Sequence, residues 1–454
     1  MSTADQQGVL GLDEARSHIA RTVFADRLGG PEVGQVGLEP EYLTMQLDAD
    51  GAPEGRLKLE GERSVLHALE RLAGSGDTLR LDHPGPPPVY LLQNGGRLTF
   101  EPGAQVEHST AIHSTAAAAM EDVDEVAKLL LRTLADEGAT LGSVGLDLWT
   151  DRDVVEQQLR AGRYDAMAAY LAERSEHGRM MMRHSCSFQV NLDLGERTVA
   201  EERWRLANLL TPISVASFAC SPEDGWTSRR ARAWQKLDPT RTGFPKCLLA
   251  GKRTEPGACY AELALDADVL LFHHADGKGA TPGTPGFRFR DWVENGHPDF
   301  GWPTIKNLDY HLTTLFPEVR LRGFFEIRSA DASPLRLRAA QVVFWIGLLY
   351  DAKARRAALE LLEPDVTRLQ ELWVAAARDG LADSDVHERS RTIWELALEG
   401  AGRLPAGYFR GRDLRRAQEF FASYVEAGRS PGDELLERMS QDPRGALEWS
   451  VTLD

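Results

Sequence analysis

The sequence predicts an α+β fold in which strands and helices are mixed over residues 1–335 and helices alone fill residues 336–454. Alternation of apolar and polar residues, the pattern of a half-buried strand, occurs at 35–48, 97–110, 184–194 and 318–330. After Pro334, apolar residues recur at helical spacing. No internal repeat or low-complexity linker separates the two parts, so we expect them to form one structural domain.

The composition is that of a globular protein. With 454 residues, of which 42% are hydrophobic, the chain is long enough for one large domain or two to three ordinary ones, and disordered and collagen-like classes are excluded. A net charge of −17 argues against nucleic acid as a partner. The four cysteines have no CxxC spacing, so we expect them to be reduced.

Membrane and export signals are not expected. Met1–Val9 lacks the basic and apolar segments of a signal peptide. The longest apolar run, Val342–Leu349, is far shorter than the roughly 20 residues that cross a bilayer. We therefore expect a cytoplasmic protein, a monomer or a homodimer, without a membrane partner.

Periodicity and breaker residues place the other elements. In 11–28 and 115–137, apolar residues recur at helical spacing, and a glycine follows each segment. Residues 52–96 and 221–300 are too rich in Gly and Pro to assign. The remaining expected elements are a short strand at 142–149, helices at 151–177 and 199–219, and helices at 336–361, 366–379, 384–400, 412–427 and 433–441.

Side chains alternate along a strand, so the polar residues of each of the four long strand segments that stand two apart point to the same face. Glu39 and Glu41 point the same way at one end of an otherwise apolar face, which also suits a strand end that runs into water. Glu101 and Glu107 flank a Pro-Gly turn, as in an ordinary hairpin with a wet face.

If the four strands share one sheet, their polar side chains form a single face. A carboxylate cluster of that size repels itself unless divalent cations neutralise it, and all-oxygen ligands suit Mg²⁺ or Mn²⁺. Mg²⁺ usually accompanies phosphate, so nucleotide chemistry is indicated, although neither GxGxxG nor GxxxxGK[ST] is present. The face would carry Glu39, Glu41, Glu101, Glu107, Gln189, Asn191, Glu326 and Arg328.

A basic stretch at 229–241 adds a second candidate. Arg230 and Arg241 suit a phosphate clamp, and Trp234 suits stacking on a base. A solvated basic helix face would explain the stretch equally well if it stood alone.

Several segments resemble motifs of the glutamate–cysteine ligases of family 2, the plant-type and actinobacterial enzymes. The resemblance runs in order from about residue 33 to residue 355. The segments are EPGAQVE at 101–107, MMMRHSCSFQVNLD at 180–193, the Arg, Trp, Asp and RTG positions within 230–243, HLTTLFPEVR at 311–320, and FEIR at 325–328.

This resemblance implies a glutamine-synthetase-like fold, in which a curved, mainly antiparallel sheet forms a funnel flanked by helices. It also implies ATP- and Mg²⁺-dependent ligation of the γ-carboxyl of glutamate to the amino group of cysteine through γ-glutamyl phosphate. The product, γ-glutamylcysteine, serves glutathione or ergothioneine synthesis. The expected partners are small molecules: glutamate, cysteine or another amine, and ATP.

Residue roles follow from the same resemblance. Mg²⁺, with Mn²⁺ as an alternative, would be held by Glu39, Glu41, Glu101, Glu107 and Glu326. Gln189 and Asn191 would line the site near metal or substrate. Arg328, beside Glu326, would face the substrate carboxylate or the acyl phosphate. Arg230 and Arg241 would clamp phosphate or glutamate, with Trp234 shaping the wall.

The sequence departs from the family pattern at several positions beside the site, where the usual ELS is Glu107-His-Ser109 and the usual RTC is Arg183-His-Ser-Cys186. Pro40, Tyr42 and Ala104 replace a His, a Lys and a Gly of the usual motifs. Two alternatives therefore stay open: a γ-glutamyl ligase that uses a different amine, and a catalytically silent relative that binds nucleotide.

Overall fold

The computed structural model describes residues 9–82, 87–160, 162–274 and 279–453. A ten-stranded sheet runs in the order β11-β12-β8-β1-β6-β5-β4-β3, with β2 and β7 also paired to β1, and each pairing is antiparallel. The predicted α+β class with a mainly antiparallel sheet is confirmed. The strands are β1 Val36–Leu47, β2 Pro53–Arg56, β3 Thr78–Leu81, β4 Val89–Leu92, β5 Arg97–Phe100, β6 Val106–Ser109, β7 Ala139–Gly142, β8 Phe188–Leu192, β11 Val319–Leu321 and β12 Phe325–Ile327, with β9 Leu271–His273 and β10 Ala280–Pro282 in a separate hairpin.

The sheet is organised around β1, which has four neighbours. Its first part pairs with β8, which puts Glu39 opposite Gln189. The next residues pair with β6, which puts Glu41 opposite Glu107, and its second half pairs with β7 and β2. The other edge of β8 pairs with β12, which puts Glu326 opposite Asn191. The strands predicted to carry the carboxylates are thus neighbours in one sheet.

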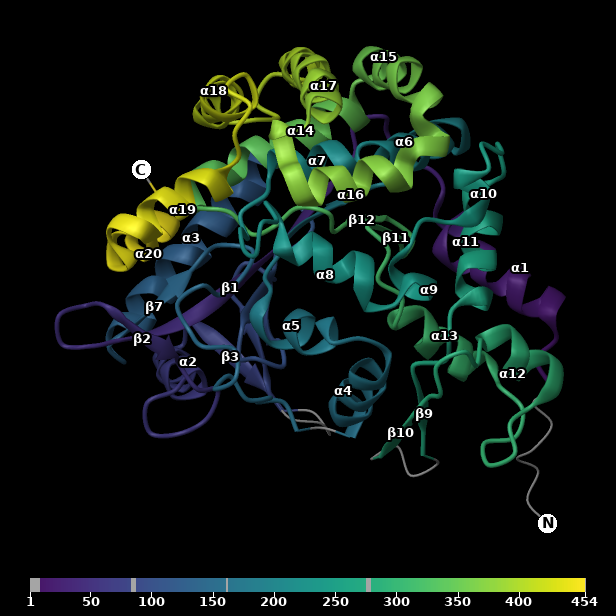
Figure 1. Ribbon diagram of the computed structural model, residues 1–454, viewed down its shortest axis with the longest axis horizontal. Coiled ribbons are helices and arrows are strands. Elements are labelled where there is room, and N and C mark those ends of the chain that lie inside the picture. The colour runs from purple at the N-terminus through teal and green to yellow at the C-terminus, as the bar shows by residue number, and fades with distance from the viewer. Residues whose placement is uncertain (1–8, 83–86, 161, 275–278, 454) are drawn as a thin grey trace.

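Helices cover the sheet on two sides (Figure 1). Helices α6, α7 and α14 to α18 gather along one side, whereas α4, α5 and α8 lie on the other. No helix in the described part of the chain combines the length and the apolar character needed to cross a membrane. Before residue 335 the helices are α1 Leu12–Val23, α2 Val65–Ser75, α3 Ala116–Ala135, α4 Gly162–Arg174, α5 His177–His184, α6 Arg197–Leu209, α7 Thr211–Ser217, α8 Arg229–Leu237, α9 Pro239–Thr242, α10 Lys246–Leu249, α11 Pro256–Asp266, α12 Phe289–Asn295 and α13 Ile305–Thr313.

The C-terminal part is helical, as predicted. The helices expected at 366–379, 384–400, 412–427 and 433–441 are confirmed as α16 to α19, although α18 continues as a π-helical turn at Phe421–Val425. The final helix, α20, has no counterpart in the prediction. These helices are α14 Arg338–Tyr350, α15 Ala352–Leu362, α16 Leu369–Asp379, α17 Ser384–Arg403, α18 Gly411–Phe420, α19 Pro431–Gln441 and α20 Pro443–Val451.

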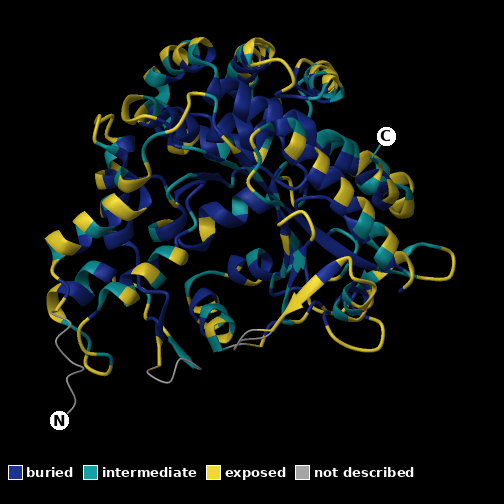
Figure 2. Cartoon of the chain, turned by 180° about the vertical axis from the view of Figure 1, so that it is seen from behind, coloured by how far each residue is buried: buried dark blue, intermediate teal, exposed yellow. Residues whose placement is uncertain are grey.

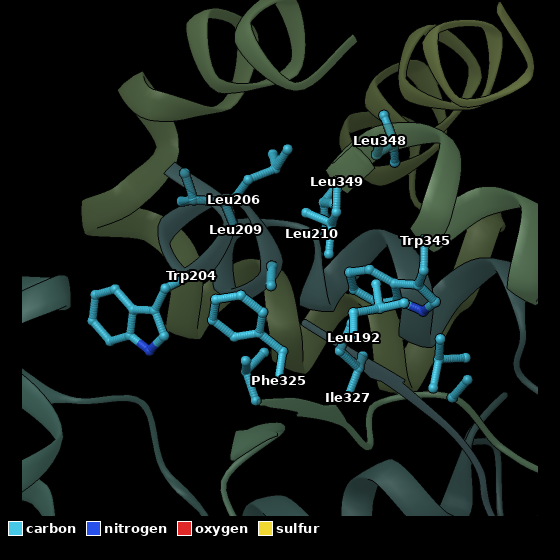
Figure 3. Close-up of a cluster of buried hydrophobic side chains, with 14 of the residues drawn as sticks. Leu192, Trp204, Leu206, Leu209, Leu210, Phe325, Ile327, Trp345, Leu348 and Leu349 are labelled. Atoms are coloured by element: carbon cyan, nitrogen blue, oxygen red, sulfur yellow. The ribbon is translucent and has the colours of Figure 1, made fainter. Parts of the chain in front are cut away.

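The two faces of the central strands have opposite character. Leu192, Phe325 and Ile327 pack against side chains of α6 and α14 in one large apolar cluster (Figure 3). Since side chains alternate along a strand, Asn191 and Glu326 point to the other face. Figure 2 shows buried residues concentrated along the sheet and the inner helices, with exposed residues on the outer helices and loop tips. The apolar face is therefore closed by helices, and the polar face is left to line a site.

The strand expected over 318–330 is a hairpin instead of one continuous strand. β11 turns at Gly323, whose φ of +79° lies in the left-handed region that glycine adopts readily, and returns as β12. The alternating pattern continues through the turn, so periodicity alone gives no sign of the reversal. As a result, Arg320 lies directly opposite Glu326 on the neighbouring strand.

Two expected elements in the first half are wrong in their extent. The short strand predicted at 142–149 lies earlier, as β7, and ends at Gly142. The helix predicted over 151–177 begins only at Gly162, and a separate helix, α5, follows it. Periodic patterns identify an element's type better than its ends.

Two long helices are each broken in two. The helix expected at 199–219 divides before Pro212, which stands in the first turn of α7 and lacks the N–H that a continuous helix would need. The helix expected at 336–361 divides at Asp351, whose carboxylate caps α15 by accepting from the N–H of Ala354 at 2.7 Å.

The expectation of four reduced cysteines is wrong for one pair. Cys247 and Cys259, on the adjacent helices α10 and α11, form a disulfide with their Cα atoms 6.0 Å apart. Cys186 and Cys220 are buried and unpaired. The sequence spacing gave no sign of the bond, because the pairing depends on how α10 folds back on α11.

Candidate active site

A cavity of about 230 Å³ opens on the polar face of the sheet. Its floor comes from β1, β5, β6, β8, β11 and β12, and its walls include residues of α4, α5, α8 and α13. Its charged lining residues are Glu39, Glu41, Arg97, Glu101, Glu107, Arg163, Arg320, Arg322, Glu326 and Arg328. Its other lining residues are Pro102, Gln105, Tyr164, Met167, Met181, Met182, Ser185, Gln189, Trp234, Leu270, Leu271, Tyr310, Thr313, Thr314 and Phe316.

Most of the predicted site residues meet in this cavity. The five glutamates predicted as metal ligands all line it, together with Gln189, Trp234 and Arg328. Among the described residues, Asn191, Arg230 and Arg241 are not part of the lining. Asn191 stands behind Glu39 and donates its Nδ2–H to Oε1 of that carboxylate at 3.1 Å.

The carboxylates of β1 and β6 are held by neighbouring strands. Both oxygens of Glu41 accept from Ser187, one from the backbone N–H at 2.7 Å and the other from Oγ at 2.8 Å, and Gln189 Nε2 donates to it at 3.2 Å. Glu107 accepts from Thr99 Oγ1 at 2.8 Å. These bonds fix the directions of the carboxylates while leaving them facing the cavity.

The acidic part of the cavity carries more negative charge than its surroundings stabilise. Burial, and then the charges of Glu107 and Glu326, raise the pKa of Glu39 to about 7. Burial, and then the charges of Glu107 and Glu41, raise the pKa of Glu101 well above its usual value. Burial and the charge of Glu41 also raise the pKa of Glu107. A bound cation would relieve this repulsion.

The part of the cavity beside β11 and β12 has the opposite balance. Arg320 donates two hydrogen bonds to the carboxylate of Glu326, from Nε at 2.8 Å and from Nη2 at 2.7 Å. Arg322 donates to the same carboxylate at 3.2 Å, and Arg328 donates to it as well. Burial opposes ionisation, but the three guanidinium groups outweigh it and lower the pKa of Glu326 to about 2. This carboxylate is therefore ionised and already paired.

The donor set fits magnesium that is shared with phosphate. Among the described residues, no three His, Cys, Asp or Glu side chains already stand as a metal-binding group. Mg²⁺ is typically held by one or two carboxylates, with substrate phosphates and water as the other ligands. Glu41 and Glu107, opposite each other on neighbouring strands, offer such a pair. The metal role of Glu326 remains a prediction, since arginines occupy both of its oxygens.

Arg241 is placed outside the cavity, contrary to the prediction of a clamp. Its side chain is fully buried and donates to Asp238 Oδ2 at 2.7 Å, to the carbonyl of Asp268 at 2.7 Å and to the carbonyl of Thr314 at 2.9 Å. Of these partners, Thr314 lines the cavity. Arg241 therefore supports the wall from behind and does not border the cavity.

Arg230 is also placed behind the wall, where it contacts Arg328 and Trp234. The guanidinium groups that do border the cavity, apart from Arg328, belong to Arg97, Arg163, Arg320 and Arg322. Arg320 stands within the HLTTLFPEVR segment, which also supplies Thr313, Thr314 and Phe316. That motif was the signal that could have found them, and the segment at 180–193 includes Met181 and Met182 of α5, whereas nothing in the sequence singled out Arg163 or Met167 of α4.

The comparison with known families agrees with this geometry. A model of glutamate–cysteine ligase family 2 matches residues 35–452. The chain belongs to this family. The ligase is 35% identical over 436 residues to the glutamate–cysteine ligase EgtA of Mycolicibacterium smegmatis, covering 94% of this chain and 91% of that one.

Other relatives extend the comparison. The ligase is 30% identical over 435 residues to EgtA of Mycobacterium tuberculosis, covering 92% of this chain and 95% of that one. It is 28% identical over 385 residues to the chloroplastic glutamate–cysteine ligase of Arabidopsis thaliana, covering 81% of this chain and 69% of that one. A glutamate–cysteine ligase of Francisella tularensis, solved in complex with AMP, has the same fold with a TM-score of 0.56 at 12% identity, covering 93% and 88%. This likeness and the observed topology confirm the predicted α+β fold, with a mainly antiparallel sheet flanked by helices and a helical C-terminal region.

Proposed function

We propose that this ligase joins the γ-carboxyl of L-glutamate to the amino group of L-cysteine at the expense of ATP, through γ-glutamyl phosphate, to give γ-glutamylcysteine. The observation that carries the proposal is the pairing, in one cavity, of an acidic region on β1, β6 and the turn between β5 and β6 with an arginine-rich region at β11, β12 and the residues that follow each of them. An acidic face suits a metal-bound triphosphate, and guanidinium groups suit a carboxylate and an acyl phosphate.

Glu39, Glu41, Glu101 and Glu107 are the groups proposed to hold the metal. Bound Mg²⁺, with Mn²⁺ as an alternative, would neutralise the triphosphate and bring its terminal phosphate toward the arginines. The raised pKa values of Glu39, Glu101 and Glu107 support this assignment, because burial and the neighbouring carboxylates outweigh the attraction of the nearby arginines, so that a further cation would be favoured beside them.

Arg328 is the proposed partner of the reacting groups. A γ-carboxylate oxygen of glutamate attacks the terminal phosphorus of ATP and ADP leaves. The amine nitrogen of cysteine then attacks the acyl carbon, phosphate leaves, and the nitrogen loses a proton. The Nη1 of Arg328 already donates to Gln189 Oε1 at 2.8 Å, so its guanidinium is fixed in the cavity, and the chain supplies positioning and charge neutralisation.

Three of the departures from the family motifs lie outside the cavity lining, whereas Ser185, in the segment that replaces the usual RTC, is part of it. Pro40 and Tyr42 alternate with Glu39 and Glu41 along β1, so they face away, and Tyr42 is fully buried with its hydroxyl accepting from Arg338 Nη1 at 2.8 Å. Ala104 is likewise buried and outside the lining. These three residues were the only support for a catalytically silent relative, and their placement favours an active ligase that makes γ-glutamylcysteine.

The test is ADP release by the full chain with glutamate, Mg²⁺·ATP and a panel of amines, followed by mass measurement of the product. We expect glutamate-dependent turnover with cysteine as the best amine and complete loss on metal chelation. Glu107→Gln should abolish turnover, whereas the matched control Glu54→Gln, at an exposed position of β2, should not. The proposal would be refuted if no amine in the panel gave ADP release that depends on glutamate.

A further inference from the structure

A buried ion pair lies directly behind the cavity wall. Arg230, on α8, and Asp331, just after β12, are each 1% exposed, and Nη1 of Arg230 lies 3.7 Å from Oδ1 of Asp331. Neither residue is part of the cavity lining. A buried charge pair costs desolvation, so the question is what these two side chains hold in place.

Arg230 contacts two residues that line the cavity. Its Nη2 donates to the backbone carbonyl of Arg328 at 3.0 Å. Its guanidinium also lies 4.6 Å from the ring centroid of Trp234, one helical turn further along α8. One side chain therefore fixes both the backbone from which Arg328 projects and the face of an aromatic wall residue.

Asp331 is in turn held from several directions. It accepts from the N–H of Cys220 at 2.9 Å, from Ser221 Oγ at 2.6 Å and from Ser228 Oγ at 3.1 Å. Asp331 packs directly against the backbone of Gly145, where a side chain would not fit, because a Cβ on Gly145 would stand 2.5 Å from Cγ of Asp331. Such a fully engaged carboxylate is a fixed point against which Arg230 is oriented.

The same segment also reaches the acidic side of the cavity. Asp331 forms a β-bridge with Ser187, and Ser187 donates both its N–H and its hydroxyl to Glu41. The ion pair is thus connected by direct contacts to Arg328 on one side and to Glu41 on the other.

We infer that Arg230 and Asp331 are positioning residues of the ligase reaction, which act through Arg328 and Trp234 and not by touching substrate. The inference rests on the proposed function, because it takes Arg328 to face the reacting groups. A displacement of the order of 1 Å at such a group costs about 10²-fold in rate. Loss of the pair should therefore lower kcat far more than it changes the KM for ATP, because two of the proposed metal ligands are held by other residues: Glu39 by Asn191 and Glu107 by Thr99.

The experiment compares Arg230→Met and Arg230→Lys with Arg355→Met. Arg355 is an equally buried arginine on α15 that pairs with Glu202 and Glu32 and has no contact with the cavity lining. Circular dichroism and denaturant titration report folding, and steady-state ADP release reports kcat and each KM. We expect kcat to fall at least about 10-fold in Arg230→Met with the KM for ATP within about 3-fold, and to stay within about 2-fold in Arg355→Met.

Arg230→Lys keeps a positive charge behind the wall, and it tests the inference if Arg230→Met does not fold. It should lower kcat by at least about 5-fold, because an ammonium group cannot contact Arg328, Asp331 and Trp234 together. The inference fails if the folded Arg230 variants keep kcat within 2-fold of an active wild type. It also fails if kcat falls as far in Arg355→Met as in the Arg230 variants. A wild type without glutamate-dependent turnover would instead refute the proposed function.

Discussion

Two glutamates in the same cavity should respond with opposite signs to the same substitution. Glu39→Gln removes a charge that its surroundings disfavour, since burial and two other carboxylates raise its pKa to about 7. Glu326→Gln removes a charge that three arginines stabilise, since they lower its pKa to about 2 against the effect of burial. Each substitution keeps the size and the planar shape of the side chain.

The magnitudes follow from linkage between proton binding and folding. For Glu39, a rise from 4.5 to about 7 means that the ionised side chain destabilises the folded state by up to about 3 kcal/mol. This penalty is absent at low pH, grows as the pH rises from about 4.5 to 7, and is complete above that range. For Glu326, a fall from 4.5 to about 2 gives a stabilisation of similar size, present above pH 4.5 and lost as the pH falls toward 2.

The assay is urea unfolding of both variants and the wild type at pH 8 and pH 5, without metal or nucleotide. At pH 8, Glu39→Gln should raise the free energy of unfolding by up to about 3 kcal/mol, and most of this gain should disappear at pH 5. Glu326→Gln should lower the free energy of unfolding by about 3 kcal/mol at both pH values. A Glu39→Gln variant that is no more stable than wild type at pH 8, or whose gain persists at pH 5, would refute the electrostatic reasoning.

Two further substitutions test the packing around the cavity. Gly103→Ala would place a Cβ 2.2 Å from the carbonyl oxygen of Arg183, so urea unfolding should show a loss of about 1–3 kcal/mol and ADP release should fall, because the turn that follows Glu101 must shift. Unchanged stability and turnover would contradict the close contact. Tyr42→Phe removes the hydroxyl that accepts from Arg338, so it should cost about 1.5–3 kcal/mol of stability while kcat stays within about 2-fold, measured in the same two assays. A large loss of kcat at unchanged stability would mean that Tyr42 acts on the cavity.

The acidic face was predictable because it depends only on alternation within strands. Once Glu39, Glu41 and Glu107 lie on half-buried strands, a period of two sends them to the polar side whatever the neighbouring strand is. What alternation does not give is the order of strands. The opposition of Arg320 and Glu326 requires a turn at Gly323, and nothing in the pattern of 318–330 distinguishes a turn from a continuing strand.

The direction in which a buried arginine side chain points could not be predicted from the sequence either. Arg230 and Arg241 stand in a basic stretch that suits a phosphate clamp, yet the structure directs both guanidinium groups to backbone carbonyls and a carboxylate behind the wall. A long side chain can satisfy its donors on protein or on ligand, and only packing decides between them. The cations that border the cavity come partly from Arg97 and Arg163, outside that stretch.

Gln189 shows why the two parts of the cavity can adjoin at all. Its Nε2–H donates to Glu41 at 3.2 Å, and its Oε1 accepts from Arg328 at 2.8 Å. An amide is the side-chain group of this size that donates to an acid and accepts from a guanidinium at once. A carboxylate here would repel Glu41, and an ammonium would repel Arg328. The acidic and basic regions are therefore joined by a neutral residue whose two ends have opposite polarity, and Glu41 and Arg328 both line the cavity on either side of it.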